Sequence, residues 1–397
     1  MHLIEKINSW LLVGLLFFVS ISTFMGSLIS ALIFILWLLH ANFRDQLLQI
    51  RSNPVAIASF LFFCIHIVGL FWSDDIQSGL EVIKKNWKFF MLPIFMLYAR
   101  KSHISLYINA FLASIFLSEF LSYLIWFEII DPLFKASKYN PTVFMSHVVY
   151  NPLLAIAIYL VATRIIFDKP KSPILLFFGV FFLFTMIVNM FITGGRSGQI
   201  IFFVSIFIIA FQFFKKSFFK LFMVSIISSV TIFALAYSYS DLFKERMIQT
   251  LDNVRGYESN RNTMIGKRIS FFTNGVEVVM DNPFFGVGTG DLESEMTKVH
   301  LINTPEIHAP DNPHNSHLMV AIRFGFLGLL TFLWIFYAQI KSSSKIENIE
   351  LARLAFALPV LFLIVSFGDS YLSSHVTSLF YCALSAVIYA RYEDKRT

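Results

Sequence analysis

Three short polar motifs stand at the ends of apolar segments and carry residue types that bind anions or move protons. They are residues 193–198 (TGGRSG), residues 266–272 (GKRISFF) and residues 313–317 (PHNSH). An arginine guanidinium is planar and suits bidentate binding of a phosphate. A histidine titrates near neutral pH and can serve as a general base. Together these motifs predict a site that handles a phosphate-bearing substrate and transfers a proton.

Arg196 follows two glycines in a tight turn between two apolar runs. Glycine lets the backbone bend sharply and approach closely, so we expect the turn to hold Arg196 at the membrane surface between two rigid helices. Two interpretations stay open. Arg196 binds a phosphate, or its side chain extends to lipid headgroups from an ordinary hairpin turn.

Lys267 and Arg268 stand just ahead of a second amphipathic stretch. Two cations at the start of a helix oppose its dipole unless an anion joins them. A phosphate site and a solvated basic turn both agree with this pattern. The glycine-rich residues 286–290 do not follow a strand of a βαβ unit, so a dinucleotide site is excluded and a flexible turn is the better interpretation.

His314 lies where a polar segment enters an apolar one, and both a general base and a structural histidine fit this position. The four neighbouring histidines, at 300, 308, 314 and 317, also raise the possibility of a metal site. Their spacing matches no standard zinc motif, and no carboxylate stands among them at helical spacing. We therefore predict no metal ion and no cofactor.

The elements that position these motifs are expected to be membrane helices. Of the 397 residues, 57% are hydrophobic and 14% are charged, against about a quarter charged in soluble domains. The apolar residues form long runs without the alternation of barrel strands, so they predict helices. We expect an all-α polytopic membrane protein with about twelve transmembrane helices. They fall near residues 10–24, 27–40, 54–72, 87–100, 104–127, 143–163, 174–192, 198–214, 219–238, 317–339, 350–367 and 371–390.

Lysines and arginines of the short loops mark the cytoplasmic side. They give one consistent topology, with both termini in the cytoplasm and the three polar motifs on the outer side. Residues 74–88 are the exception, because Lys84, Lys85 and Lys88 fall outside, and we interpret this segment as a short interfacial helix. The net charge of +6 reflects the topology and does not indicate a nucleic-acid partner.

A long segment without an apolar run, residues 240–316, separates two membrane parts. Long loops in compact proteins are usually functional or disordered, and the apolar content of this one favours a function. We expect a large periplasmic loop with short helices near 243–251 and 269–280. The chain then divides into a membrane domain of about nine spans (1–239), this loop, and three C-terminal spans with a cytoplasmic tail (317–397).

The sequence also resembles a known family. His314-Asn315, nine further residues and then Gly325-Phe326-Leu327-Gly328 resemble the signature of the O-antigen ligase and polymerase superfamily. Residues 191–200 are similar to the family's Gly/Ser-Arg turn. Arg268 with its following aromatic residues, and then residues 282–288 (NPFFGVG), resemble the loop segment before the family histidine. The resemblance covers roughly residues 175 to 340.

This resemblance implies a membrane-embedded glycosyltransferase of the inner membrane whose active site faces the periplasm. Its donor would be a glycan on undecaprenyl pyrophosphate, and its acceptor would be the lipid A-core. His314 would deprotonate the acceptor hydroxyl, while Arg196 and Arg268 would bind the pyrophosphate. Direct attack by the acceptor would invert the anomeric configuration, without a metal ion and without a covalent enzyme intermediate.

The chain departs from the family pattern at one place. Many members carry an acidic residue ahead of the Gly-x-x-Gly, where this chain has Arg323. An arginine several residues into a span is costly and predicts a partner, for which Glu119, Asp369 or a backbone carbonyl are candidates. The residues expected to support the site are Lys267, Asn315, His317 and Arg323.

Two other functions fit parts of the same pattern. An O-antigen polymerase uses the same lipid-linked donor and would use the same residues, but the intact histidine signature favours the ligase. A transporter of the lipid-linked glycan would show repeats and broken helices at the membrane midplane. Here the polar groups gather at the outer face and in one long segment, which favours an enzyme.

Overall fold

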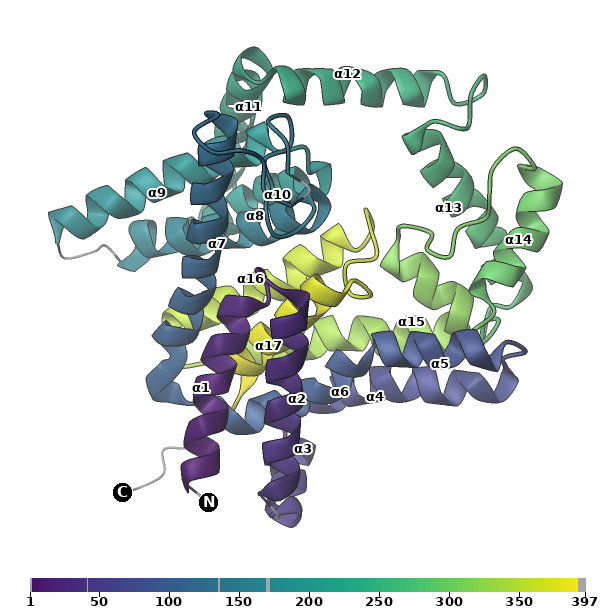
Figure 1. Ribbon diagram of the computed structural model, residues 1–397, viewed down its shortest axis with the longest axis horizontal. Helices are drawn as coiled ribbons and strands as arrows, with labels where there is room; N and C mark the ends of the chain where they lie inside the picture. Colours follow the sequence, from purple (N-terminus) through teal and green to yellow (C-terminus); the bar gives the residue numbers. More distant parts are fainter. Residues whose placement is uncertain (1, 41, 135, 169–171, 392–397) are drawn as a thin grey trace.

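The computed structural model describes residues 2–40, 42–134, 136–168 and 172–391 (Figure 1). These residues form helices joined by turns and loops, and one isolated bridge joins Ser137 and Asn140. The expected all-α fold is confirmed. The helices are α1 (His2–Phe18), α2 (Thr23–Leu39), α3 (Phe43–Ser52), α4 (Pro54–Val68), α5 (Ile76–Lys85), α6 (Trp87–Tyr98), α7 (Ile104–Trp126), α8 (His147–Thr163), α9 (Pro173–Ile192), α10 (Arg196–Phe213), α11 (Phe218–Tyr239), α12 (Asp241–Arg255), α13 (Met264–Asp281), α14 (Leu292–Asn303), α15 (Ser316–Ser343), α16 (Ile349–Val365) and α17 (His375–Tyr389).

The expected count of twelve membrane spans is not confirmed. Within the described parts of the chain, seven helical segments are long and apolar enough to cross a membrane, or eight if α2 and α3 count as one bent span. The seven contain α4, α7, α8, α9, α10, α11 and α15. Helices also stand at the other five expected positions, but α6 has 12 residues and α1, α2 and α16 have 17 each. At 1.5 Å per residue they rise about 18 to 26 Å, less than the roughly 30 Å of a hydrocarbon core.

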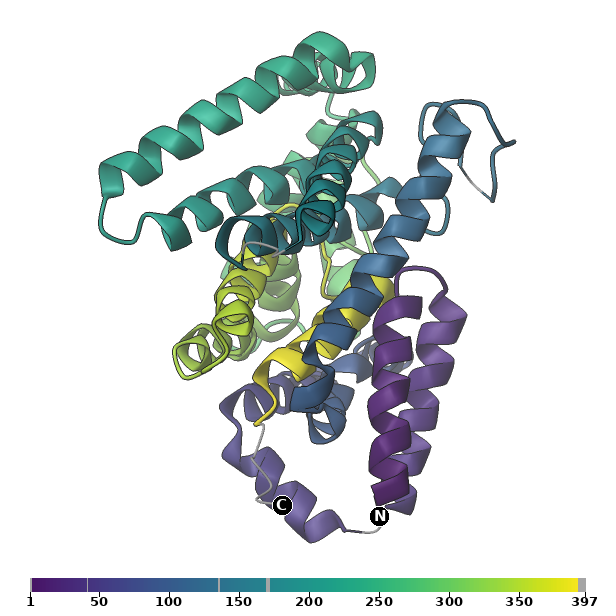
Figure 2. The ribbon, with the colours of Figure 1, turned by 90° about the vertical axis from the view of Figure 1, so that its left-hand side faces the viewer.

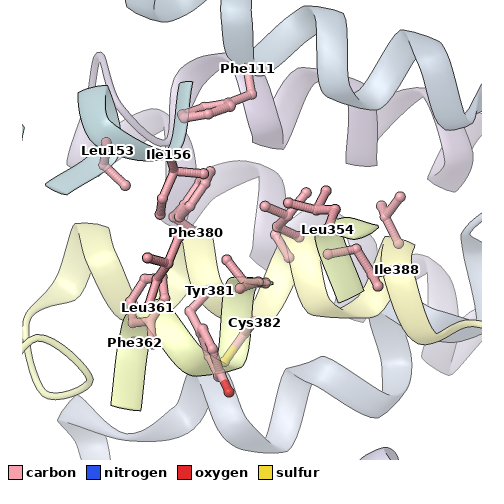
Figure 3. Packing of buried hydrophobic residues seen from close by; sticks show 14 of the residues in the cluster. Phe111, Leu153, Ile156, Leu354, Leu361, Phe362, Phe380, Tyr381, Cys382 and Ile388 are labelled. Carbon is pink, nitrogen blue, oxygen red and sulfur yellow. The ribbon is translucent and has the colours of Figure 1, made fainter. Parts of the chain in front are cut away.

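The fifth of these, α17, has 15 residues and lies inside the protein. Its residues from Val376 to Tyr389 are buried, and it packs against α1, α6, α8 and α16. Figure 3 shows Phe380 of α17 among Phe111, Leu153 and Ile156, and the rings of Phe111 and Phe380 have centroids 4.5 Å apart. Helices α1 and α2 lie side by side as a hairpin at the edge of this core (Figures 1 and 2). Neighbouring helices therefore surround this short helix, including its polar residues Thr377, Ser378 and Ser385.

The turn that carries Arg196 is held by the packing of α10 on α8. Asn151 of α8 is fully buried, and its Oδ1 accepts a hydrogen bond of 2.8 Å from the Thr193 hydroxyl. A Cβ at Gly198 would lie 2.3 Å from the Asn151 Cβ, so only glycine permits this approach. The glycines of the motif thus fix the start of α10, and with it the position of Arg196.

Two of the motifs noted in the sequence are joined to each other. Helix α15 kinks at Gly325, whose φ of 60° and ψ of −151° are not helical. The loop at residues 282–288 lies in the kink, where the amides of Val287 and Gly288 donate to the carbonyls of Ile322 and Arg323 at 2.9 Å. Hydrogen bonds therefore hold this glycine-rich segment in place, and our interpretation of it as a flexible turn is wrong.

Gly325→Ala is expected to destabilise the protein by about 1–3 kcal/mol or more, because this backbone conformation is essentially restricted to glycine. A Cβ there would also lie 2.4 Å from the Phe284 carbonyl carbon. Thermal unfolding in detergent measures the effect. Gly179→Ala in α9 is the matched control, since its Cβ would meet the nearest atom at 3.6 Å. Equal unfolding temperatures for the two variants would contradict the assignment.

The long segment between α11 and α15 contains three helices, α12, α13 and α14, where we expected two. In Figure 1, α12 crosses from α11 toward α13. The carboxylate of Asp291 ties the segment to the end of α4, because it accepts hydrogen bonds from the Ser73 hydroxyl at 2.5 Å and from the amides of Asp74 and Asp75. The three-part division of the chain and the orientation in the membrane stay predictions.

Candidate functional site

The loop between α16 and α17, residues 366–374, brings the site together. Its Asp369 carboxylate lies 3.0 Å from Nδ1 of His314 and 3.5 Å from the guanidinium of Arg268. The Arg268 guanidinium also donates to the Gly368 carbonyl at 3.0 Å. Two residues predicted separately from sequence, the histidine and one arginine, are thus held by one carboxylate.

The surroundings of Asp369 favour the ionised form of its carboxylate. Its side chain is only 13% exposed, and burial alone would raise its pKa. The hydrogen bond from His314, the backbone amide of Ser370 at 2.7 Å and the charge of Arg268 outweigh burial and lower the pKa below its ordinary value. An ionised carboxylate only accepts hydrogen bonds, so Nδ1 of His314 carries a proton, and in the neutral ring Nε2 is the nitrogen with the lone pair.

The backbone around His314 fixes its ring. Its φ is 53°, in the left-handed region that non-glycine residues seldom adopt. The His314 amide donates to the Asn312 side chain at 2.9 Å, which closes a tight turn across Pro313. The imidazole lies nearly parallel to the ring of Phe271 in α13, with centroids 6.4 Å apart. Strain of this kind is maintained where the surroundings specify one conformation, and such positions cluster at functional sites.

Three arginines gather beside this histidine. Arg196 begins α10, and the charges of both Arg246 and Arg268 act on it. Arg246 comes from α12 and its guanidinium lies over the glycine turn, since a Cβ at Gly194 would be 3.7 Å from it. Like charges in proximity repel, so the cluster favours binding of a multiply charged anion.

The remaining predicted site residues lie around this centre. Asn315 caps α15 by accepting from the Leu318 amide at 3.1 Å, and the His317 ring stacks on Phe367 with centroids 3.9 Å apart. Lys267 is exposed on α13. Of the three candidate partners considered for Arg323, Asp369 pairs with His314 and Arg268 instead.

Sequence reasoning missed two members of the site. Asp369 was considered only as a partner for Arg323, although a single acid after a glycine between two apolar runs is a visible signal. Arg246 stands in a helix of mixed charge, where nothing in the sequence distinguishes it from its neighbours. Its place depends on the packing of α12 above the glycine turn.

The histidines of the long segment do not converge. Nδ1 of His300 in α14 donates to the Met296 carbonyl at 2.8 Å, and His308 is exposed. Across the residues that the structure describes, no group of three His, Cys, Asp or Glu side chains could hold a metal ion. Cys64 and Cys382 are free thiols.

The fold and the site describe a protein with several helices long and apolar enough to cross a membrane, in which a histidine held by a carboxylate lies near a cluster of guanidinium groups. A family model described as O-antigen ligase matches residues 181–333, which include Arg196, Arg268 and His314. The match supports the resemblance to the O-antigen ligase and polymerase superfamily, a family of glycosyl-transferring enzymes. Asp369 lies beyond the matched residues. A comparison with curated proteins found no match.

Proposed function

We propose that this protein is a lipopolysaccharide O-antigen ligase of the inner membrane. It transfers a glycan from undecaprenyl pyrophosphate to the lipid A-core at the periplasmic face. The observation that supports this most directly is the hydrogen bond between His314 and Asp369 beside the arginine cluster. Residues 181–333, which include His314, also match the family. A base and an anion site are the two parts that such a transfer needs.

The reaction is a single displacement. Nε2 of His314 takes the proton of the acceptor hydroxyl while the acceptor oxygen forms a bond to the anomeric carbon. The bond from that carbon to the pyrophosphate oxygen breaks, and its electron pair leaves with undecaprenyl pyrophosphate. The ionised Asp369 stabilises the imidazolium as it forms, and the anomeric configuration is inverted. No nucleotide is needed, because the pyrophosphate is already the leaving group.

Arg196, Arg246 and Arg268 stabilise the charge that grows on the departing pyrophosphate. Their mutual repulsion in the free protein is relieved when the anion binds. Because this site supplies its positive charge from arginines, we expect chelators to leave transfer unchanged in purified protein. Loss of activity with a chelator and its recovery with a divalent cation would contradict this mechanism.

Replacing Arg196 or Arg268 by Lys is expected to lower kcat/KM by about tenfold or more, because a point charge cannot form two parallel hydrogen bonds with a phosphate. The measurement is the rate of transfer in reconstituted membranes. Arg255→Lys, at the exposed end of α12, is the control and should match the wild type. Unchanged kinetics in both site variants would refute the pyrophosphate assignment.

The function itself is tested by deleting the gene and separating the extracted lipopolysaccharide on a gel. The ligase is supported if the core is bare while long glycans accumulate on undecaprenyl pyrophosphate. A core that carries a single repeat unit would identify a polymerase instead. Transfer by purified protein without any ion gradient would count against a transporter.

A further inference from the structure

A cavity of about 260 Å³ lies next to the histidine site and shares one residue with it, Asp369. Its walls come from segments far apart in the chain. They include Lys85 at the end of α5, Asp311 and Asn312 before α15, and Arg323 within α15. None of the three arginines of the pyrophosphate site lines it. The cavity therefore adjoins the histidine site at the Asp369 carboxylate and is distinct from the arginine cluster.

Arg323 is the unusual member of this cavity. Only 9% of it is exposed, and its buried Nε has no hydrogen-bond partner among the described residues. Buried polar groups are nearly always hydrogen-bonded, and a buried cation without a partner is strongly unfavourable. Asp311 acts on Arg323 through space, but Asp369 is engaged by His314 and Arg268. The guanidinium therefore has bonding capacity left for a ligand.

Lys85 adds a second cation at the exposed side of the same cavity. It belongs to the segment whose lysines break the charge rule for cytoplasmic loops. Because Lys85 lines a cavity beside Asp369, this one lysine has a reason to lie on the side of the site. Close by, the Lys88 ammonium donates to the Lys85 carbonyl at 2.5 Å, which holds the turn between α5 and α6.

We propose that this cavity is an anion subsite for the acceptor glycan, resting on the proposed ligase function. Arg323 and Lys85 bind a phosphate or carboxylate substituent of the acceptor sugar, beside the Asp369 carboxylate that holds His314. The cavity is smaller than the roughly 300–1,000 Å³ of most ligand pockets, so it fits one substituted sugar and no longer chain. The pyrophosphate of the donor is already accounted for by the arginine cluster.

The test compares three acceptors in transfer assays with the full-length protein. One is the intact lipid A-core, one has its phosphates removed, and one has its carboxylates amidated. The wild type is expected to show a KM about tenfold higher or more for the acceptor that lacks the recognised anion. The identity of that acceptor shows whether the recognised anion is a phosphate or a carboxylate.

Arg323→Gln and Lys85→Gln should raise the KM for the intact acceptor by a similar factor, with the donor KM unchanged, and should remove the discrimination among the acceptors. Lys84→Gln is the matched control, because this exposed lysine neighbours Lys85 but does not line the cavity. If Arg323→Gln does not fold, the acceptor KM of Lys85→Gln alone tests the proposal. Wild-type KM values in the variants, or an increase only for the donor, would overturn the subsite. Failure of the wild type to use any of the three acceptors would instead overturn the ligase function.

Discussion

His314→Asn is expected to lower glycan transfer by about 10²–10⁴-fold, the usual contribution of a general base. The bond from Nδ1 to Asp369 leaves Nε2 as the only ring atom with a free lone pair, and asparagine has no comparable base. Asparagine is chosen because it tolerates the left-handed backbone at this position. The measurement is single-turnover transfer with reconstituted protein.

The control for this variant is His308→Asn, which changes an exposed histidine of the same long segment. It should retain wild-type activity. Both variants should unfold at similar temperatures, so that a loss of activity in His314→Asn reports chemistry. Near-normal transfer by a folded His314→Asn protein would remove histidine from the mechanism.

Asp369→Asn is expected to lower transfer by at least about 100-fold. The amide can donate to Nδ1 of His314, which moves the ring proton to Nε2, and it cannot balance the charge of the imidazolium. It also weakens the hold on Arg268, 3.5 Å away. Asp281→Asn, an exposed acid at the end of α13, is the control. Normal activity in Asp369→Asn would mean that the carboxylate does not position the base.

We also expect the effect of Asp369→Asn on the stability of the folded protein to depend on pH. Since folding lowers the pKa of Asp369, the ionised carboxylate stabilises the folded state at every pH above the unfolded value of about 3.9. This contribution disappears as the pH falls through the lower pKa of the folded state. The difference in unfolding temperature between the wild type and Asp369→Asn should therefore be constant from pH 8 to about pH 5 and shrink below about pH 4. A difference that grows toward acid pH would contradict the lowered pKa.

Local features of the chain were sufficient for the helices and for three site residues. Long apolar runs must form helices in lipid because the backbone has to satisfy its own hydrogen bonds, and this depends only on neighbouring residues. The chemistry of Arg196, Arg268 and His314 also follows from side-chain type and from short motifs around them. Both kinds of information can be read from the sequence alone.

The partners of these residues were decided by tertiary structure. Asp369 is 55 positions from His314 and 101 from Arg268, and the loop between α16 and α17 brings it to both. Arg246 reaches the site because α12 packs near the glycine turn, as the short distance from Gly194 shows. No local pattern encodes such approaches, since they depend on how whole helices pack.

The membrane helices show the same difference between what is local in the sequence and what depends on tertiary packing. Apolar composition located the helices, but it did not show which of them other helices surround. Helix α17 is as apolar as a span, yet its 15 residues are buried against α1, α6, α8 and α16. Sequence thus determined the helical class and the reactive side chains, because these are local properties. Packing decided which helices are surrounded by others and which carboxylate holds His314, because both depend on contacts between distant segments.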